Sequence, residues 1–202
     1  MIRKTTLLLP PVQEAPEGKP AFCPRCCSPY LARHGTLRRP LSDTTVSSVS
    51  VQRYRCSRCG FTLRQYPAGV GRARRSTRLV VLAALLRSLG LSCTATARVL
   101  GGAEAYISQA TVWRAVRATG LREPSQPRRR MPVRVLASGE SPEDPGEGLL
   151  LRFMEDPASG AKVGVEVWGY GEEALPPELH AFVRSSGAKL TAGPQESFTR
   201  AS

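Results

Sequence analysis

Four cysteines stand in two pairs whose spacing suits a metal site. Two residues separate Cys23 from Cys26, and two residues separate Cys56 from Cys59. This spacing lets one tight turn direct both sulfurs at a single ion, and four thiolates are the ligands of a tetrahedral structural zinc. We therefore predict that these four cysteines bind one Zn2+ ion.

Two other chemistries would use the same four cysteines. Disulfide bonds would need an oxidising compartment, whereas the cytosol keeps thiols reduced. A rubredoxin-like iron centre has the same ligands, and the sequence does not separate iron from zinc. No further ligand is needed, so we expect Cys27 to be a bystander, Cys93 a small buried side chain, and His34 and His180 ordinary surface or core residues.

Short strands are expected beside the second cysteine pair. Residues 49–54 alternate between apolar and polar side chains, and residues 61–66 show a similar pattern. Gly60 directly follows the second pair, where a turn often needs a positive φ that glycine adopts at no steric cost. We expect residues 20–68 to form a zinc ribbon that depends on the ion, because its own core is small.

Three helices are predicted next, each beginning after a serine that can cap its N-terminus. The first starts after Ser76 and ends at Gly90, the second starts after Ser92, and the third starts after Ser108 and ends at Gly120. In the first helix, apolar residues recur at positions i, i+3, i+4 and i+7. This spacing predicts an amphipathic helix.

The arrangement of helices over residues 76–120 predicts a helix-turn-helix DNA-binding domain, with an ordinary three-helix bundle as the alternative. The connection over residues 101–107 is longer than the three or four residues usual in a helix-turn-helix. The second helix is expected to close at Gly101-Gly102, because glycine commonly follows the end of a helix. In the third helix, Val112, Trp113 and Val116 are expected to form the inward stripe. By the helical period, Ala110, Thr111 and Arg114 then face outward, with Arg117 on the flank.

The outward face of the third helix is predicted to contact DNA. An arginine on this face can bind O6 and N7 of guanine, a threonine can touch a thymine methyl group, and amides in the first turn suit a phosphate. Two short basic runs, residues 72–75 and 128–130, could enter a minor groove. The expected DNA-binding residues are Ser108, Gln109, Ala110, Thr111, Arg114, Arg117, Arg72, Arg74 and Arg75.

The distribution of charge also favours a polyanionic partner. Residues 1–130 contain 23 Lys and Arg against 5 Asp and Glu, a net charge of +18, while residues 131–202 contain 6 against 11, a net charge of −5. The two parts sum to the net charge of +13 of the whole chain. Most of these cations are arginines, which suit bidentate contacts to phosphate and guanine, so we expect double-stranded DNA as the partner.

The sequence contains no membrane-spanning segment, because no apolar run reaches the roughly 20 residues that such a helix needs. The leucines at 7–9 precede Pro10-Pro11 and are too short for the apolar region of a signal peptide, which has about 7 to 15 residues. We therefore expect a cytoplasmic protein that does not bind membranes, with a flexible N-terminus over residues 1–19. A hydrophobic content of 41% argues against general disorder.

Four short sequence motifs follow the first cysteine pair. They are Arg53-Tyr54-Arg55-Cys56, Phe61-Thr62-Leu63-Arg64-Gln65-Tyr66-Pro67, Leu89-Gly90-Leu91-Ser92 and Thr111-Val112-Trp113-Arg114. Arranged in this way, residues 20–170 resemble bacterial insertion-sequence transposases of the DDE type. The resemblance implies that two N-terminal modules bind transposon-end DNA. It also implies a ribonuclease-H-like domain that cuts and joins DNA strands with three carboxylates holding two divalent metals.

The C-terminal part departs from that family where the catalytic carboxylates should stand. The elements expected there are strands over 133–136, 149–153, 163–168 and 188–191, and a helix over 177–185. The first strand runs into Ala137-Ser138-Gly139-Glu140 and the fourth into Ala192-Gly193, so neither delivers the aspartate that the resemblance implies. Two metals about 4 Å apart need several carboxylates, which Glu140 alone does not supply. We therefore expect no strand-transfer activity.

The sequence thus predicts a multi-module α+β protein that binds duplex DNA, with transposon ends as the expected target. Its modules would be a zinc ribbon over 20–68, a helix-turn-helix domain over 76–120, a basic linker over 121–130 and a truncated ribonuclease-H-like α/β remnant over 131–202. The partners expected besides DNA are a second copy of the chain or an intact transposase. Three alternatives stay open: a functional transposase subunit, a DNA-binding transcription regulator, and a module that works through protein contacts.

Overall fold

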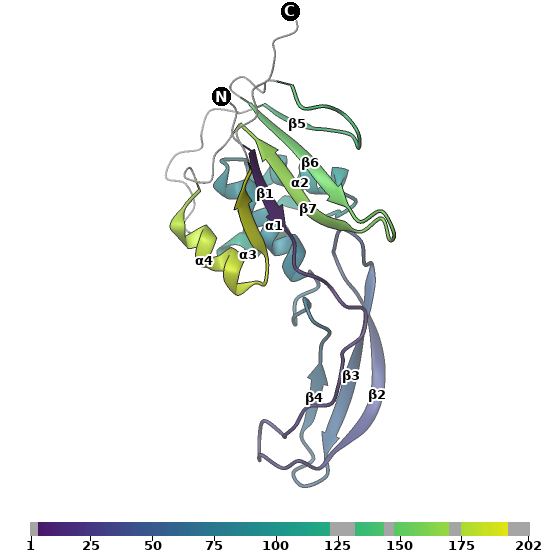
Figure 1. Ribbon diagram of the computed structural model, residues 1–202. Coiled ribbons are helices and arrows are strands. Elements are labelled where there is room, and N and C mark those ends of the chain that lie inside the picture. The colour runs from purple at the N-terminus through teal and green to yellow at the C-terminus, as the bar shows by residue number, and fades with distance from the viewer. Residues whose placement is uncertain (1–3, 122–131, 144–147, 170–174, 194–202) are drawn as a thin grey trace, which may run out of the picture.

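The structure is a computed structural model that describes residues 4–121, 132–143, 148–169 and 175–193. Within these residues the chain is a mixed α+β protein with four helices and two β-sheets. Figure 1 shows the helices and the larger sheet packed together, and the smaller sheet projecting away from them. None of the helices in the described part of the chain is long and apolar enough to cross a membrane.

The larger sheet combines strands from both ends of the chain, in the order β5-β6-β7-β1-β8. Its strands are β1 (Lys4–Leu8), β5 (Val133–Val135), β6 (Leu149–Glu155), β7 (Lys162–Trp168) and β8 (Lys189–Ala192). β5 and β6 run parallel, and the other neighbours are antiparallel. The four strands expected in the C-terminal part are therefore confirmed, close to their predicted bounds.

Strand β1 corrects the expectation of a flexible N-terminus. Leu7 pairs with Val165 of β7 on one side and with Leu190 of β8 on the other, and its side chain is fully buried. A strand between two neighbours satisfies its backbone hydrogen bonds on both edges, and Leu7 adds apolar area to the core. The expectation was therefore wrong for Lys4–Leu8.

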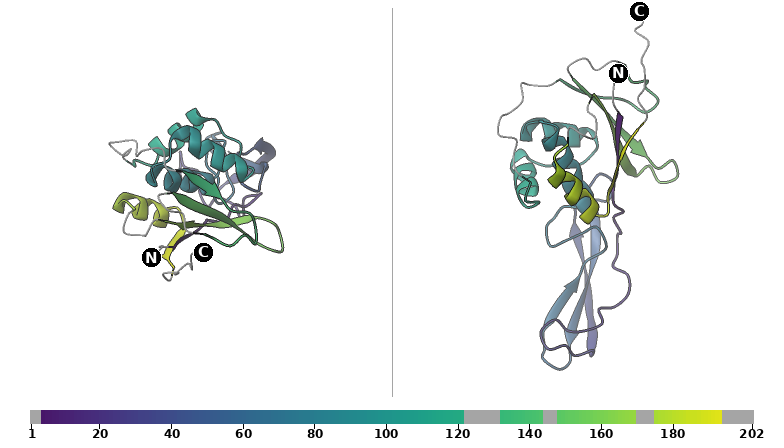
Figure 2. Two further views of the ribbon diagram at one scale, coloured as in Figure 1. Left: turned by 90° about the horizontal axis from the view of Figure 1, so that it is seen from above. Right: turned by 60° about the vertical axis from the view of Figure 1, so that its left-hand side comes forward.

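The helices cover one face of the larger sheet, as Figure 2 shows. They are α1 (Thr77–Ser88), α2 (Cys93–Gly102), α3 (Gln109–Arg117) and α4 (Pro177–Ser185). One hydrophobic core contains Leu82 of α1, Val112 of α3, Leu179 of α4, and Leu151 and Val167 of the sheet. The three-helix segment and the C-terminal strands therefore share a single core.

Helix α1 is central and is not amphipathic. Eight of its 12 residues are buried, because it contacts the three other helices and also packs against the larger sheet. The prediction of an amphipathic helix was wrong because the spacing of the leucines shows only one of the two faces that α1 buries. A helix that is apolar all round is typical of the interior of a protein.

Serine side chains cap the first three helices as predicted. The Oγ atoms of Ser76, Ser92 and Ser108 accept hydrogen bonds from the backbone N–H three residues later, at 3.1, 3.1 and 3.2 Å. Gly90 and Gly120 have positive φ angles just beyond the ends of α1 and α3. These caps and stops are local features, which is why sequence alone locates them.

The end of α2 is where the sequence predicted it. Gly101 and Gly102, which were expected to close the helix, are its last two residues. The chain turns shortly afterwards at Glu104, whose φ is 63°. Non-glycine residues rarely adopt this conformation, so the sequence carried no signal for the turn.

The smaller sheet is antiparallel, with three strands in the order β2-β3-β4. Its strands are β2 (Leu31–Pro40), β3 (Ser48–Cys56) and β4 (Thr62–Gln65). β3 and β4 confirm the strands expected over 49–54 and 61–66. β2 was not predicted, because nearly all its side chains are exposed and its sequence does not alternate.

Buried polar contacts attach the smaller sheet to the rest of the molecule. Asp43, in the loop between β2 and β3, accepts a hydrogen bond from Ser76 Oγ and lies 3.3 Å from Arg78 Nε. Arg78 Nη1 donates to the carbonyl oxygen of Lys162 in β7 at 3.0 Å. Asp43 therefore links the smaller sheet to the start of α1, and Arg78 links α1 to the larger sheet.

Candidate metal centre and nucleic-acid interface

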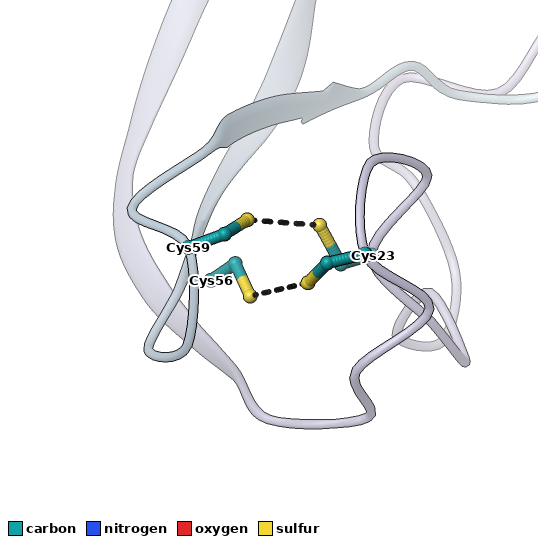
Figure 3. Close-up of side chains that lie close together, drawn as sticks. Cys23, Cys56 and Cys59 are labelled. Carbon is teal, nitrogen blue, oxygen red and sulfur yellow. Dashed lines mark hydrogen bonds between the residues drawn. The ribbon is translucent and has the colours of Figure 1, made fainter.

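The four predicted ligands come together at the far end of the smaller sheet (Figure 3). The Sγ atoms of Cys23 and Cys59 are 3.7 Å apart, those of Cys26 and Cys56 are 3.6 Å apart, and all four lie within 4.8 Å of one another. Zn–S bonds of about 2.3 Å in a tetrahedron place the sulfurs about 3.8 Å apart. A disulfide would need about 2.05 Å, and all four cysteines are free. The cluster therefore fits a bound metal ion.

Two turns of the same shape present the sulfurs. The N–H of Cys27 donates to the carbonyl oxygen of Cys23 at 2.9 Å, and the N–H of Gly60 donates to that of Cys56 at 3.0 Å. The φ angles of the two donors are 55° at Cys27 and 70° at Gly60, which confirms the conformation expected at Gly60. Cys27 thus occupies the equivalent position in the first turn, where its side chain is exposed and outside the cluster.

The thiols of the cluster differ in acidity. The backbone N–H of Cys59, with help from that of Arg58, lowers the pKa of Cys56 to about 6 against the opposing effect of burial. The backbone hydrogen bond at Ser28 lowers the pKa of Cys26, but burial and the neighbouring sulfurs outweigh it and raise that pKa to about 12. Binding of a metal to four thiolates therefore releases protons and weakens at acid pH.

Helix α3 turns a different face outward from the one predicted. Val112 and Val116 are buried as expected, but Ala115 completes the buried stripe in place of Trp113. The Trp113 side chain is 42% exposed, and the guanidinium of Arg117 lies 5.0 Å from the centre of its ring. The buried stripe follows positions i, i+3 and i+4, so the prediction that Trp113 faces inward was wrong. The Trp113 ring lies on the outer face, one helical turn before Arg117.

Part of the predicted DNA-binding set is already engaged within the helices. Gln109 Oε1 accepts a hydrogen bond from Thr94 Oγ1 at 2.8 Å. Ser108 Oγ caps α3 and lies 3.0 Å from Oγ1 of Thr111, which is half-buried. The basic run 128–130 lies outside the described residues. The predicted residues of α3 that are exposed are Gln109, Ala110, Arg114 and Arg117.

The basic segment before α1 is held against the smaller sheet. Arg39 Nη2 donates to the carbonyl oxygen of Arg72 at 3.2 Å, and the N–H of Ser42 donates to that of Arg74 at 2.8 Å. The side chains of Arg72 and Arg74 are exposed, and Arg75 is half-buried. The backbone is therefore fixed, and these arginines extend from a defined surface instead of a free arm.

Cations and aromatic rings on the smaller sheet were missed by the sequence analysis. Arg53 of β3 stands directly opposite Arg64 of β4 in the strand register. Three aromatic side chains near the cysteine turns are exposed, and they are Phe22, Tyr30 and Phe61. Arg53 and Arg55 alternate with apolar residues along β3, and this alternation was used only to predict a strand. It also indicates that the two arginines share one face of the sheet.

The described residues show one group of side chains that could hold a metal, the four cysteines. The Glu140 carboxylate pairs with Arg134 and accepts a hydrogen bond from the N–H of Ala137 at 2.9 Å. β5 and β8 lie at opposite edges of the larger sheet, four strand spacings or about 19 Å apart. Carboxylates at the ends of these two strands could not share metals about 4 Å apart.

The chain matches no family model, no curated protein and no solved structure. Its resemblance to insertion-sequence transposases thus rests only on the short sequence motifs and their order along the chain. The features of the structure from which a function can be inferred are the cysteine cluster and the cationic surfaces of α3 and the smaller sheet.

Proposed function

We propose that this protein binds duplex DNA, with α3 in the major groove. The observation that carries the proposal is the outer face of α3, where Arg114 and Arg117 are exposed beside Trp113. Arginines on an exposed helix suit the O6 and N7 atoms of guanine and the phosphate oxygens. Glu104 is the only acidic residue in the segment 69–121, so a polyanion meets little repulsion there.

Further exposed cations outside this helix predict a strong dependence on salt. Arg98 of α2 is exposed, as are Arg72 and Arg74 of the fixed segment before α1. If the complex neutralises about 6 phosphates, the logarithm of the association constant should fall with the logarithm of the salt concentration with a slope of about −5. A slope near zero would contradict electrostatic binding.

We also propose that the cysteine cluster holds zinc. Sulfur separations that match the edges of a ZnS4 tetrahedron support this assignment. Iron uses the same ligands, but an iron–thiolate centre absorbs visible light, whereas zinc has a filled d shell and is colourless. We expect one zinc per chain by elemental analysis, a colourless protein, and loss of the metal from Cys23→Ser.

Single substitutions on α3 test the DNA proposal. Arg114→Ala should weaken binding of a preferred duplex by about 5- to 150-fold and relax the preference at one base pair, since a bidentate base contact contributes about 1–3 kcal/mol. The control is Arg134→Ala on β5, because this exposed arginine is paired with Glu140 and Glu143. If Arg114→Ala and Arg117→Ala leave affinity and sequence preference unchanged, the proposal fails.

We propose further that the chain derives from an insertion-sequence transposase and occupies transposon ends without cutting them. Two observations support the loss of cleavage: Glu140 is paired with Arg134, and β5 and β8 are at opposite edges of the sheet. A magnesium-dependent nicking assay is the test. Cleavage by the purified protein that disappears in Glu140→Gln would favour a working transposase subunit, and footprints at promoters in place of inverted repeats would favour a transcription regulator.

A further inference from the structure

The cysteine end of the smaller sheet carries exposed aromatic side chains. The exposed fractions are 62% for Phe22, 71% for Tyr30 and 36% for Phe61. Each of these residues is connected to the cysteine turns. Phe22 directly precedes Cys23 in the sequence. The carbonyl oxygen of Tyr30 accepts a hydrogen bond from the N–H of Ser57 at 3.0 Å, and the carbonyl oxygen of Phe61 accepts one from the N–H of Cys56 at 2.9 Å. The backbone of these residues therefore lies beside the cysteine turns, and all three rings are exposed to solvent.

Cations continue from this end along one face of the sheet. Arg53 is directly opposite Arg64, and Arg55 is directly opposite Thr62, the residue after Phe61. Directly opposite residues of an antiparallel pair share a face, as do residues two apart on one strand, so the three arginines lie together. Like charges in direct opposition destabilise a sheet, and Arg53 Nε is buried with no hydrogen-bond partner among the described residues. A bound anion would offset both costs.

The charge of residues 19–68 is almost entirely positive, which suits a polyanionic partner. Residues 19–68 contain nine Lys and Arg and one acidic residue, Asp43, which is buried against Arg78. Two exposed carboxylates outside this segment lie near the sheet: the carbonyl oxygen of Glu14 accepts from the N–H of Ser50, and that of Glu17 accepts from the side chain of Gln65. Gln65 is next to Arg64 on β4 and therefore faces the opposite side of the sheet from it. The exposed charge of this segment is therefore cationic.

We propose that the cysteine end and the arginine face of the smaller sheet form a binding surface for single-stranded nucleic acid. Unpaired bases would stack on Tyr30, Phe61 and Phe22, and the phosphates would follow Arg55, Arg53 and Arg64. Aromatic rings beside a cationic track are the combination that binds single strands with little sequence preference. A duplex cannot use these rings in the same way, because its bases are already stacked on one another. This surface is separate from α3 and does not depend on the duplex proposal.

Fluorescence anisotropy with a labelled single strand of about 12 nucleotides tests this surface, using the full-length, metal-loaded protein. Tyr30→Ala and Phe61→Ala should each weaken binding by about fivefold or more without changing the salt slope, because they remove stacking and no phosphate contact. Arg53→Gln and Arg64→Gln should each reduce that slope by about 0.7. Tyr106→Ala, which removes an exposed ring from the α2–α3 connection, is the matched control and should change nothing.

The outcomes separate this proposal from the others. Wild-type affinity in the Tyr30→Ala/Phe61→Ala double variant, with its metal retained, would overturn it, and so would an equal loss of affinity for a duplex of the same length. Absence of binding to any single strand would also overturn it and would point to a protein partner. DNA and RNA strands of the same sequence distinguish the two sources of the ligand. Arg114→Ala should leave single-strand binding unchanged, so the two proposals can fail independently.

Discussion

Cys27 and Gly60 occupy equivalent positions in the two cysteine turns, and only glycine adopts their left-handed conformation without strain. A side chain at such a φ costs about 1–2 kcal/mol, whereas glycine loses about 0.5–1 kcal/mol of additional backbone entropy on folding. The first effect is the larger. Cys27→Gly should therefore raise the free energy of unfolding by about 0.5 kcal/mol and keep the full metal content, as measured by urea unfolding and elemental analysis.

Cys27→Ser is the control for this substitution, since serine keeps a side chain at a φ of 55°. It should retain the metal and show no gain in stability. Loss of metal from Cys27→Gly would mean that Cys27 takes part in metal binding.

Glu166 of β7 sits in a cluster of charges on the face of the larger sheet away from the helices. Its carboxylate lies 2.6 Å from Lys4 Nζ and 2.6 Å from Arg152 Nη2, and both cations lie over the Trp168 ring. Burial alone would raise the pKa of Glu166, but the hydrogen bonds and charges of Lys4 and Arg152 outweigh it and lower that pKa. A carboxylate whose pKa is lowered by folding stabilises the protein above its unfolded-state pKa, about 4.3.

Glu166→Gln should lower the free energy of unfolding by about 2 kcal/mol at pH 7, because it removes charge-assisted hydrogen bonds. The difference from the wild type should shrink as the pH falls below about 4, through the pKa of the folded state, where Glu166 is itself protonated. Denaturant unfolding from pH 7 to pH 3, followed by tryptophan fluorescence, measures this. Glu155→Gln, which breaks an exposed pair with Lys162, should cost less than about 1 kcal/mol. A difference that stays constant with pH would contradict the assignment.

The cysteine cluster was predicted correctly at the residue scale, and the orientation of Trp113 was predicted wrongly. Two cysteines separated by two residues determine a turn locally, and a glycine after the second pair indicates the φ it adopts. The outer face of α3 depends on which neighbouring elements pack against it. The helical period places Ala115 beside Val112 and Val116, whereas the larger apolar area of tryptophan favours Trp113, so the two signals conflict and the period is the one that holds.

At the scale of elements, Asp43 and Arg78 join the smaller sheet, α1 and the larger sheet. Asp43→Ala would leave the buried Arg78 guanidinium without its counter-charge, so the free energy of unfolding should fall by about 3–5 kcal/mol. The double variant Asp43→Ala/Arg78→Leu should recover part of that loss, because no isolated charge stays buried. A double-mutant cycle by denaturant unfolding measures the coupling. A loss below about 1 kcal/mol in Asp43→Ala would mean that the pair behaves like an exposed one.

Most elements were predictable because their signals are local, whereas their assembly was not. Serine caps and apolar spacing located α1, α2 and α3, and alternation located β3 and β4. β6 and β7 were expected as counterparts of core strands in the family that the sequence resembles. β1 had no such signal, since it is five residues long and its partners lie at the opposite end of the chain. Pairing between distant segments depends on the shape of the finished sheet, which a single sequence does not reveal.

At the scale of the whole molecule, the apolar side chains are very unequally divided. The core between the helices and the larger sheet includes buried residues from α1 to α4 and from the three strands β1, β6 and β7. The buried cluster at the cysteine end consists of Leu31 and Tyr54 with Cys23 and Cys56. A cluster of that size contributes little burial, so the proposed metal ion would supply much of the stability there.

Removal of the metal should therefore unfold one end of the molecule and not the other. After chelation, amide hydrogen exchange should become fast at both cysteine turns and in the adjoining ends of β2 and β3, because four unligated thiols and two apolar side chains cannot hold these segments. Amides of α1 and β7 should stay protected, since their core contains no cysteine ligand. Cys93→Ser, outside the cluster, is the control and should leave the effect of the chelator unchanged. Equal loss of protection throughout would show that the Asp43 contacts make the two ends a single cooperative unit, and undiminished protection at Cys56 would show that no metal stabilises the turns.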